Sequence, residues 1–376
     1  MRFKSTILSQ LLTLVSRTQF QACVDQHQAD KAMKGFSCWN QFVVLLYAQL
    51  SGKRSLREIT TGFNSNCHTH YHLNCGSIKR STLSDANNKR SYKAYQEVLE
   101  SLIRSATGQI RSKVSQAIEI FDSTQISLNE ALHQWAAKGH CLFGIKAHIN
   151  YSLQEQLPVY FDMTNANVND VIMFDRIELK ANTLYLFDRG YYDFIGWRSI
   201  IDAKAQFITR AKSNLAYEVM SNLPCGDKVI EDQLIQLTSK KNKPLQGITL
   251  RKLTVLDKQS KSLSLVTNRL EDSAERIIEL YRQRWQIEVF FKWIKQNLKI
   301  KRFVGRSENA IRTQLIIAII AYTLLRLWHH LSHSTINLKY LAASMSDRLM
   351  QRLQPNHKPP PRVQYKPSWQ GDLALC

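Results

Sequence analysis

The chain has 376 residues, of which 44% are hydrophobic, and this is enough for two or three domains that each bury a core. A formal net charge of +21 points to a polyanionic partner, nucleic acid before an acidic membrane. Seven irregularly spaced cysteines exclude a disulfide framework and suit a reducing cytoplasm.

The sequence pattern of residues 1–110 predicts a helical region. Residues 42–52 form an apolar stretch that ends at a glycine, and residues 55–58 (SLRE) predict a helix that starts with a capping box. A third helix is expected to start at Ser81 or Thr82 and to continue to residue 105. Basic residues at these helix starts suit duplex binding. We therefore expect a DNA-binding domain, with a purely structural helical cap as the alternative.

The segment from Cys67 to Cys75 contains five thiol and imidazole side chains, at Cys67, His68, His70, His72 and Cys75. Their spacing lacks the paired arrangement that closes a tetrahedral zinc site. We expect a polar loop here.

Residues 111–210 alternate between β-rich runs and helical stretches, which predicts a mixed sheet covered by helices. The strands are expected at 118–122, 141–153, 157–166, 183–190 and 205–213, and the helical stretches at 129–139 and 170–180. Asp122 lies on the first strand and Asp188 at the end of a later one, where such sheets present ligands. Each aspartate could instead cap a turn.

Three further polar residues, Lys146, His148 and Arg189, are expected to line the same cleft as the two aspartates. Residues 111–209 hold more acidic than basic side chains, whereas the flanking regions are basic. This is the distribution expected for a metal site inside a phosphate-binding frame.

The rest of the chain predicts three more parts. Residues 211–265 contain strand patterns separated by turn-forming segments and are expected to be a β-rich insertion. Residues 266–345 return to helix, including an apolar run of only 14 residues from Leu315, too short to cross a membrane. Residues 346–376 form a basic tail rich in proline.

One helix, expected from near Glu275 and capped by Asp272 or Ser273, carries four polar residues on a single stripe: Tyr281, Arg284, Glu288 and Lys295. Bulky apolar residues cluster on the flank expected to face the core, at Leu280, Ile287, Phe290, Phe291, Ile294 and Leu298. A solvated charged face is the alternative. However, residues 281–306 contain eight basic residues and a single acid, Glu288. An isolated carboxylate in a basic field suits a metal ion beside a phosphate backbone.

The spacing Y-x-x-R-x-x-x-E-x(6)-K, together with the D-S-T and D-x-G-Y segments upstream, resembles the transposases of the insertion sequence 4 family. The resemblance extends from about residue 36 to residue 345. It implies an α/β fold, in which a ribonuclease H-like catalytic core of mixed sheet and flanking helices carries a β-rich insertion and an N-terminal helical domain.

The three carboxylates of Asp122, Asp188 and Glu288 are expected to converge, because hard divalent ions take several oxygen ligands. They suit two Mg²⁺ or Mn²⁺ ions, which would serve both strand cleavage and strand transfer. Arg284 and Lys295 would neutralise phosphate oxygens, and Tyr281 would bind phosphate through its hydroxyl. The resemblance implies that these three residues hold the terminal phosphate of the element.

The predicted function is cut-and-paste transposition of an insertion sequence. Two alternatives stay open: a catalytically inactive DNA-binding derivative, and a non-transposing ribonuclease H-like metal nuclease. The expected partners are double-stranded DNA, at the element ends and the target, and a second copy of the chain in a homodimer. We expect no membrane association and a cytoplasmic location at the nucleoid.

Overall fold

The computed structural model describes residues 5–31, 33, 35–110, 114–128, 144–226, 229–238, 240–256, 262–298 and 303–351. The expected helix at 129–139 and the tail beyond residue 351 lie outside these residues. The helical elements are α1 (Ile7–Leu12), α2 (Arg17–Gln26), α3 (Cys38–Leu50), α4 (Leu56–Asn64), η1 (Cys67–Leu73), α5 (Arg80–Lys89), α6 (Tyr92–Ile110), η4 (Asp170–Asp175), η5 (Arg189–Tyr191), α7 (Phe194–Asp202), η6 (Lys240–Leu245), α8 (Ala274–Arg282), α9 (Trp285–Asn297), α10 (Glu308–Leu331) and α11 (Leu338–Arg348). The strands are β1 (Ala117–Ser127), β2 (Gly144–Ser152), β3 (Leu157–Asn165), β4 (Thr183–Phe187), β5 (Gln206–Arg210), β6 (Tyr217–Asn222), β7 (Val229–Leu237), β8 (Leu250–Leu256) and β9 (Ser262–Thr267).

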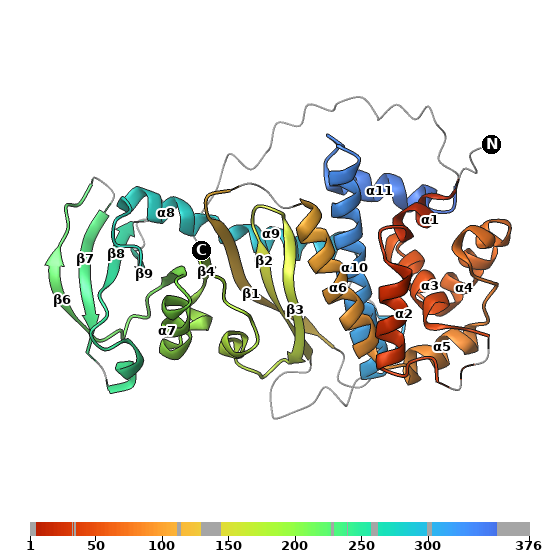
Figure 1. Cartoon of the computed structure of the whole chain (residues 1–376), viewed down its shortest axis with the longest axis horizontal. Helices are drawn as coiled ribbons and strands as arrows, with labels where there is room; N and C mark the ends of the chain where they lie inside the picture. Colours follow the sequence, from red (N-terminus) through yellow and green to blue (C-terminus); the bar gives the residue numbers. More distant parts are fainter. Residues whose placement is uncertain are drawn as a thin grey trace.

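The nine strands form one mixed sheet in the order β3-β2-β1-β4-β5-β9-β8-β7-β6 (Figure 1). Strands β1 to β3 are antiparallel, and β4 and β5 continue the sheet parallel to β1. The five residues of β4 are all buried, as expected for a central strand with both faces covered. This sheet confirms the expectation of a mixed sheet with helices.

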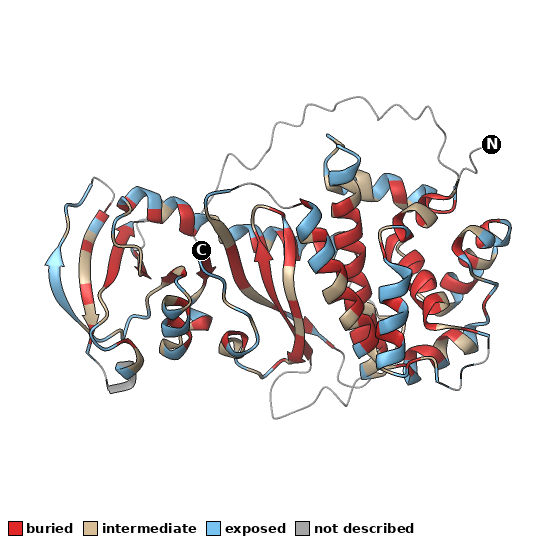
Figure 2. Ribbon diagram, in the orientation of Figure 1, coloured by how far each residue is buried: buried red, intermediate tan, exposed pale blue. Residues whose placement is uncertain are grey.

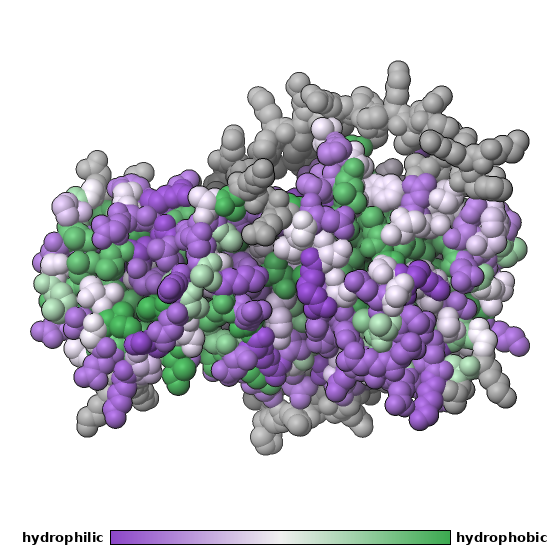
Figure 3. Space-filling model, in the orientation of Figure 1, coloured by the Kyte–Doolittle hydropathy of each residue, from purple (hydrophilic) through white to green (hydrophobic). Residues whose placement is uncertain are grey.

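The strands between residues 211 and 267 extend the same sheet. β9 pairs antiparallel with β5, and β8, β7 and β6 follow as an antiparallel series. The outermost strand leaves Val219 and Met220 exposed, and Figure 3 shows hydrophobic side chains at this end of an otherwise largely hydrophilic face. The division of the chain into domains stays a prediction.

α10 lies between the sheet and the N-terminal helices in Figure 1, and Figure 2 shows that most of it is buried. Among the described residues it is the one helix long and apolar enough to cross a membrane, and 89% of its most apolar stretch is buried inside the protein. It packs against α3, α5, α6 and β3, so N-terminal helices and a helix from the end of the chain share one core. This confirms the prediction of a buried core helix from residue 315.

Two predictions for the N-terminal region were wrong in detail. The helix expected from residue 81 or 82 to 105 is two helices, because Arg90 is extended and its buried guanidinium donates to the carbonyls of Phe36 and Ser37. The expected loop at residues 67–75 contains the 3₁₀ helix η1, which ends at Asn74 with a φ of 53°. The predicted helix ending at Gly52, with a φ of 63°, is confirmed.

Candidate active site

An open cleft separates the centre of the sheet from α9. Its walls are Asp122, Ser123 and Thr124 from β1 and a row of residues from α9, namely Glu288, Phe291, Lys292, Lys295 and Gln296. Because β4 runs parallel beside β1, Asp188, which directly follows β4, comes to the same region as Asp122. The fold therefore brings together residues that are far apart in the sequence.

Asp122 is a largely buried carboxylate, 18% exposed, beside a positive charge. Its Oδ1 accepts from the Ser123 N–H at 2.7 Å, and its Oδ2 lies 3.6 Å from Arg284 Nη1. Burial raises the pKa of Asp122 to about 7, and the carboxylates of Asp188 and Glu288 act in the same direction. Arg284 and the Ser123 N–H oppose that shift. The site therefore favours a further positive charge.

Asp188 caps the short helix η5. Its Oδ1 accepts from the Gly190 N–H at 2.8 Å, and its backbone carbonyl accepts from the Thr209 hydroxyl at 3.2 Å. Asp188 is thus a turn cap, as the alternative interpretation held, and it also lies close enough to affect the pKa of Asp122.

The single helix expected from residue 275 to 298 is two helices. α8 is capped by Ser273, whose hydroxyl accepts from the Arg276 N–H at 3.1 Å. Between α8 and α9 the backbone bonds tighten to a spacing of three residues, from Gln283 to Leu280 and from Arg284 to Tyr281. Despite this turn, the six apolar residues predicted to face the core are all buried.

Arg284 connects the two walls of the cleft. Its Nη2 donates to Glu288 Oε1 at 2.6 Å, while its Nη1 approaches Asp122. The Arg284 side chain is 13% exposed and that of Glu288 is 34% exposed. A guanidinium held by two carboxylates is well placed to exchange one of them for a phosphate.

Lys295 and Tyr281 occupy different environments. Lys295 Nζ donates to Thr124 Oγ1 at 2.5 Å, so its charge lies at the cleft beside Asp122. Tyr281 is only 6% exposed and packs in the core, which corrects the expectation that it lies off the packed flank of the helix. Burial raises the pKa of its hydroxyl to about 12.

The donor chemistry of the site fits a hard divalent cation, because the ligands on offer are carboxylate oxygens and the buried Asp122 favours a nearby positive charge. Within the part of the chain that the structure describes, no three His, Cys, Asp or Glu side chains lie close enough to hold one ion. Arg284 lies where Asp122 and Glu288 meet. The full convergence of the three carboxylates therefore stays a prediction. The expectation that residues 67–75 do not bind zinc also stays a prediction.

Lys146 and His148 do not line this cleft. Both contact Asp170, which the sequence analysis did not single out, at 3.3 Å and 3.6 Å. Arg189 is exposed beside Asp188. No sequence motif contains Asp170, because the residues it contacts lie on β2, more than 20 positions earlier in the chain.

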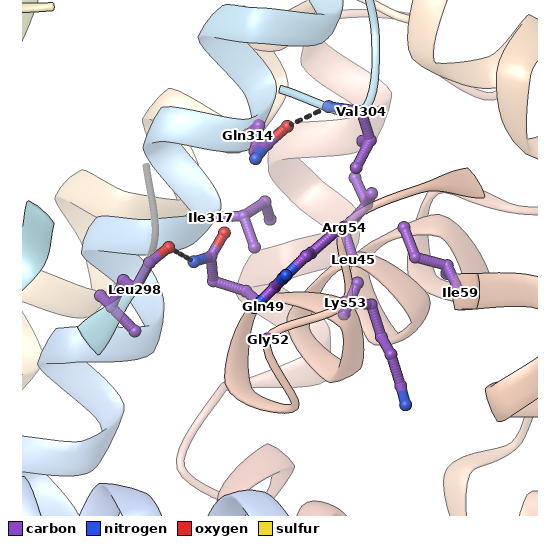
Figure 4. A pocket seen from close by; sticks show the side chains of 11 residues that line it. Leu45, Gln49, Gly52, Lys53, Arg54, Ile59, Leu298, Val304, Gln314 and Ile317 are labelled. Carbon is purple, nitrogen blue, oxygen red and sulfur yellow. Dashed lines mark hydrogen bonds between the residues drawn. The ribbon is translucent and has the colours of Figure 1, made fainter. Parts of the chain in front are cut away.

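The helical half anchors the far end of α9 (Figure 4). Gln49 on α3 donates to the carbonyl of Leu298, which ends α9, and Gln314 on α10 accepts from the Val304 N–H at 3.0 Å. The side chains of these residues line a small pocket with Lys53 and Arg54. The N-terminal helices thus help to hold the helix that carries Glu288.

Comparisons with known proteins place these features in a family. The model of the transposase DDE domain matches residues 115–324, and a domain of unknown function (DUF4372) matches residues 3–74. A Sinorhizobium fredii protein named as a transposase is 37% identical over 260 residues, covering 68% of this chain and 72% of its own. A Synechocystis protein named for insertion sequence element IS4SA is 28% identical, covering 66% and 71%.

Among solved structures, a piggyBac transposase synaptic complex with hairpin DNA aligns with a TM-score of 0.52 and 11% identity. The alignment covers 93% of this chain and 81% of the other, and it shows similarity of fold. The family match covers more than half of the chain, including all six residues predicted to form the site. The chain therefore belongs to the DDE transposases of bacterial insertion sequences, enzymes that cleave and join DNA strands.

Proposed function

We propose that Asp122, Asp188 and Glu288 are the catalytic carboxylates with which this transposase cuts an insertion sequence from double-stranded DNA and joins it to a target. The observation that carries the proposal is the position of Arg284, which contacts both Asp122 on β1 and Glu288 on α9. This contact places two carboxylates from distant segments in one cleft.

We also propose that β1 to β5 and the helices that cover them form a ribonuclease H-like core, with β6 to β9 as its insertion. The order β3-β2-β1-β4-β5, with the first three strands antiparallel and the last two parallel to β1, supports this assignment. The acidic residues then lie on the first strand, directly after the fourth strand, and on α9.

When bound, Mg²⁺ or Mn²⁺ ions, two in the full site, would activate a hydroxyl and stabilise the leaving oxygen of an in-line attack on phosphorus. Asp122, Asp188 and Glu288 would hold them. Arg284 turns from Asp122 and Glu288 toward a phosphate oxygen, and Lys295, beside Thr124, neutralises another. The backbone carbonyl of Tyr281 accepts from the Arg284 N–H at 3.0 Å, so Tyr281 positions Arg284. Its hydroxyl, which is buried, is the third phosphate contact once the ring turns out toward the DNA.

The DNA partner follows from the charge of +21 and from the family. The basic N-terminal helices, which also hold the end of α9, would bind the element ends, and two copies would assemble around a pair of ends. Such an enzyme acts at the nucleoid in the cytoplasm.

The test is a labelled duplex that carries one end of the element flanked by host DNA, incubated with full-length protein and a target plasmid. With Mg²⁺ present, we expect specific cleavage at the element boundary, followed by joining of that end to the plasmid. Cleavage without joining would indicate a nuclease. Binding without either product, in Mg²⁺ and in Mn²⁺, would indicate an inactive DNA-binding derivative.

A further inference from the structure

A cluster made of one partly buried ion pair and a buried histidine lies next to the turn that carries Asp188. Asp170, the first residue of η4, places its Oδ1 3.3 Å from Lys146 Nζ and 3.6 Å from His148 Nδ1. Both partners are on β2, where His148 pairs with Ser123, the residue after Asp122. The cluster is therefore built on the strand next to the one that carries Asp122.

His148 lies beside one oxygen of Asp170 without a hydrogen bond to it. The ring is fully buried, its Nε2 lies 2.7 Å from Thr164 Oγ1, and its Nδ1 has no hydrogen-bond partner among the described residues. Burial lowers the pKa of His148 to about 4, so the ring is neutral near pH 7 and carries one N–H. The Thr164 hydroxyl donates to the Asn165 carbonyl at 3.2 Å, so it can accept the Nε2–H, and the ring meets Asp170 as a neutral neighbour and not as a donor.

The other oxygen of Asp170 faces the turn that carries Asp188. A Cβ on Gly190 would lie 3.4 Å from Asp170 Oδ2 and 2.9 Å from Asp188 Oδ1, so the glycine separates the two carboxylates. The Gly190 N–H donates to that same Asp188 oxygen. The turn therefore depends on a residue without a side chain at this position.

Tyr191 lies in the same neighbourhood, and its N–H donates to the Asp188 carbonyl at 3.2 Å. Its side chain is 1% exposed, and its hydroxyl has no hydrogen-bond partner within the described part of the chain. Besides burial, the carboxylates of Asp122, Asp170 and Asp188 all raise its pKa. Asp170 thus belongs to the same group of carboxylates as the two proposed catalytic aspartates.

We propose that Asp170 is a positioning residue of the active site, which, anchored by its ion pair with Lys146 and packed beside His148, holds the turn from Asp188 to Tyr191 so that the Asp188 carboxylate faces Asp122. The inference rests on the proposed function, because it takes Asp188 to be a cation ligand. Lys146 balances the charge of Asp170, so the second carboxylate supports the turn instead of repelling it.

The experiment measures Mn²⁺ binding to the full-length protein, from the electron paramagnetic resonance signal of free Mn²⁺. We expect Asp170→Asn to weaken Mn²⁺ binding by about 10–100-fold, the loss typical when a residue that orients a metal ligand is removed. The melting temperature should fall by no more than a few degrees. Asp175→Asn is the matched control, because Asp175 is an exposed residue of the same short helix, and it should bind Mn²⁺ like wild type.

The variant Asp188→Asn separates the proposed cation site from the positioning role of Asp170. If it binds Mn²⁺ as wild type does, the proposed cation site is wrong and this inference fails with it. If Asp188→Asn loses binding but Asp170→Asn matches the control, only the assignment of Asp170 is overturned. Should Asp170→Asn not fold, Lys146→Gln keeps the carboxylate but removes its ion pair, and it must also weaken Mn²⁺ binding for the inference to stand.

Discussion

Arg284 is the residue on which the geometry of the cleft depends. It lies between Asp122 and Glu288 and contacts both carboxylates. A guanidinium offers several donors in a planar fork, so it can retain one carboxylate while it binds a phosphate. The same contacts that order the cleft without DNA therefore place a phosphate ligand beside the proposed catalytic residues.

Replacing Arg284 or Lys295 by alanine should slow strand cleavage by about ten- to a hundredfold, since charge-assisted contacts are worth about 1.5–3 kcal/mol each. Arg282→Ala, which removes an exposed charge from the neighbouring helix, is the control and should cleave nearly as fast as wild type. Cleavage rate and melting temperature should be measured on the same preparations. Variants that melt far below wild type would indicate that the two side chains are structural.

The raised pKa of Asp122 predicts a pH dependence of stability in the absence of divalent ions. Because this pKa is about 7 in the folded protein and 3.8 for an ordinary Asp, the folded protein keeps a proton that the unfolded chain loses between these pH values. Stability should therefore fall as pH rises from about 4 to about 7 and level off above. The variant Asp122→Asn should not show this fall in stability, because Asn does not titrate.

Urea unfolding in EDTA at pH 5 and at pH 7.5 measures this loss of stability for wild type and for Asp122→Asn. The variant should gain stability relative to wild type at the higher pH. An equal difference at both pH values would mean that Asp122 titrates normally in the fold.

At the scale of elements, the sequence predicted strands better than helix boundaries. The apolar runs before Asp122 and Asp188 marked β1 and β4, because a central strand must be apolar on both faces. The expected helices at 82–105 and 275–298 are each interrupted near an arginine whose contacts are distant in the sequence. Those contacts, like the one between Asp170 and His148, leave no local pattern.

The outer strands β7 and β8 are tied to the start of α8 by a buried ion pair. Arg251 on β8 makes two bonds to Asp232 on β7, at 2.7 Å and 2.6 Å, and also donates to the carbonyls of Leu270 and Asp272 just before α8. Both side chains are almost fully buried. This pair therefore links the outer strands to the helix that precedes Arg284.

Asp232→Asn should destabilise the protein by about 3–5 kcal/mol, because it leaves a buried guanidinium without its counter-ion. Glu231→Gln, on the same strand in a half-exposed pair with Lys252, should cost less than about 1 kcal/mol. Denaturant unfolding compares the free energies of unfolding of the two variants. Equal costs would show that the buried pair is not the link between the outer strands and α8.

At the scale of the whole molecule, α10 joins parts that the sequence analysis separated. It packs on α3, α5 and α6, so the helices of residues 1–110 lack part of their core without it. A fragment of residues 1–110 should therefore show no cooperative unfolding transition by circular dichroism. The full-length protein should unfold cooperatively. A fragment that melts in a sharp transition would establish residues 1–110 as an independent domain.

The most direct test of the proposed site is Glu288→Gln in the full-length protein. The substitution removes a carboxylate charge at the cleft but leaves the basic residues around it unchanged, so binding to the element end should survive. Binding and Mg²⁺-dependent cleavage of the same labelled end should be measured side by side with wild type. We expect near-normal binding with no detectable cleavage. Cleavage at the wild-type rate, or equal loss of cleavage and binding, would contradict this expectation.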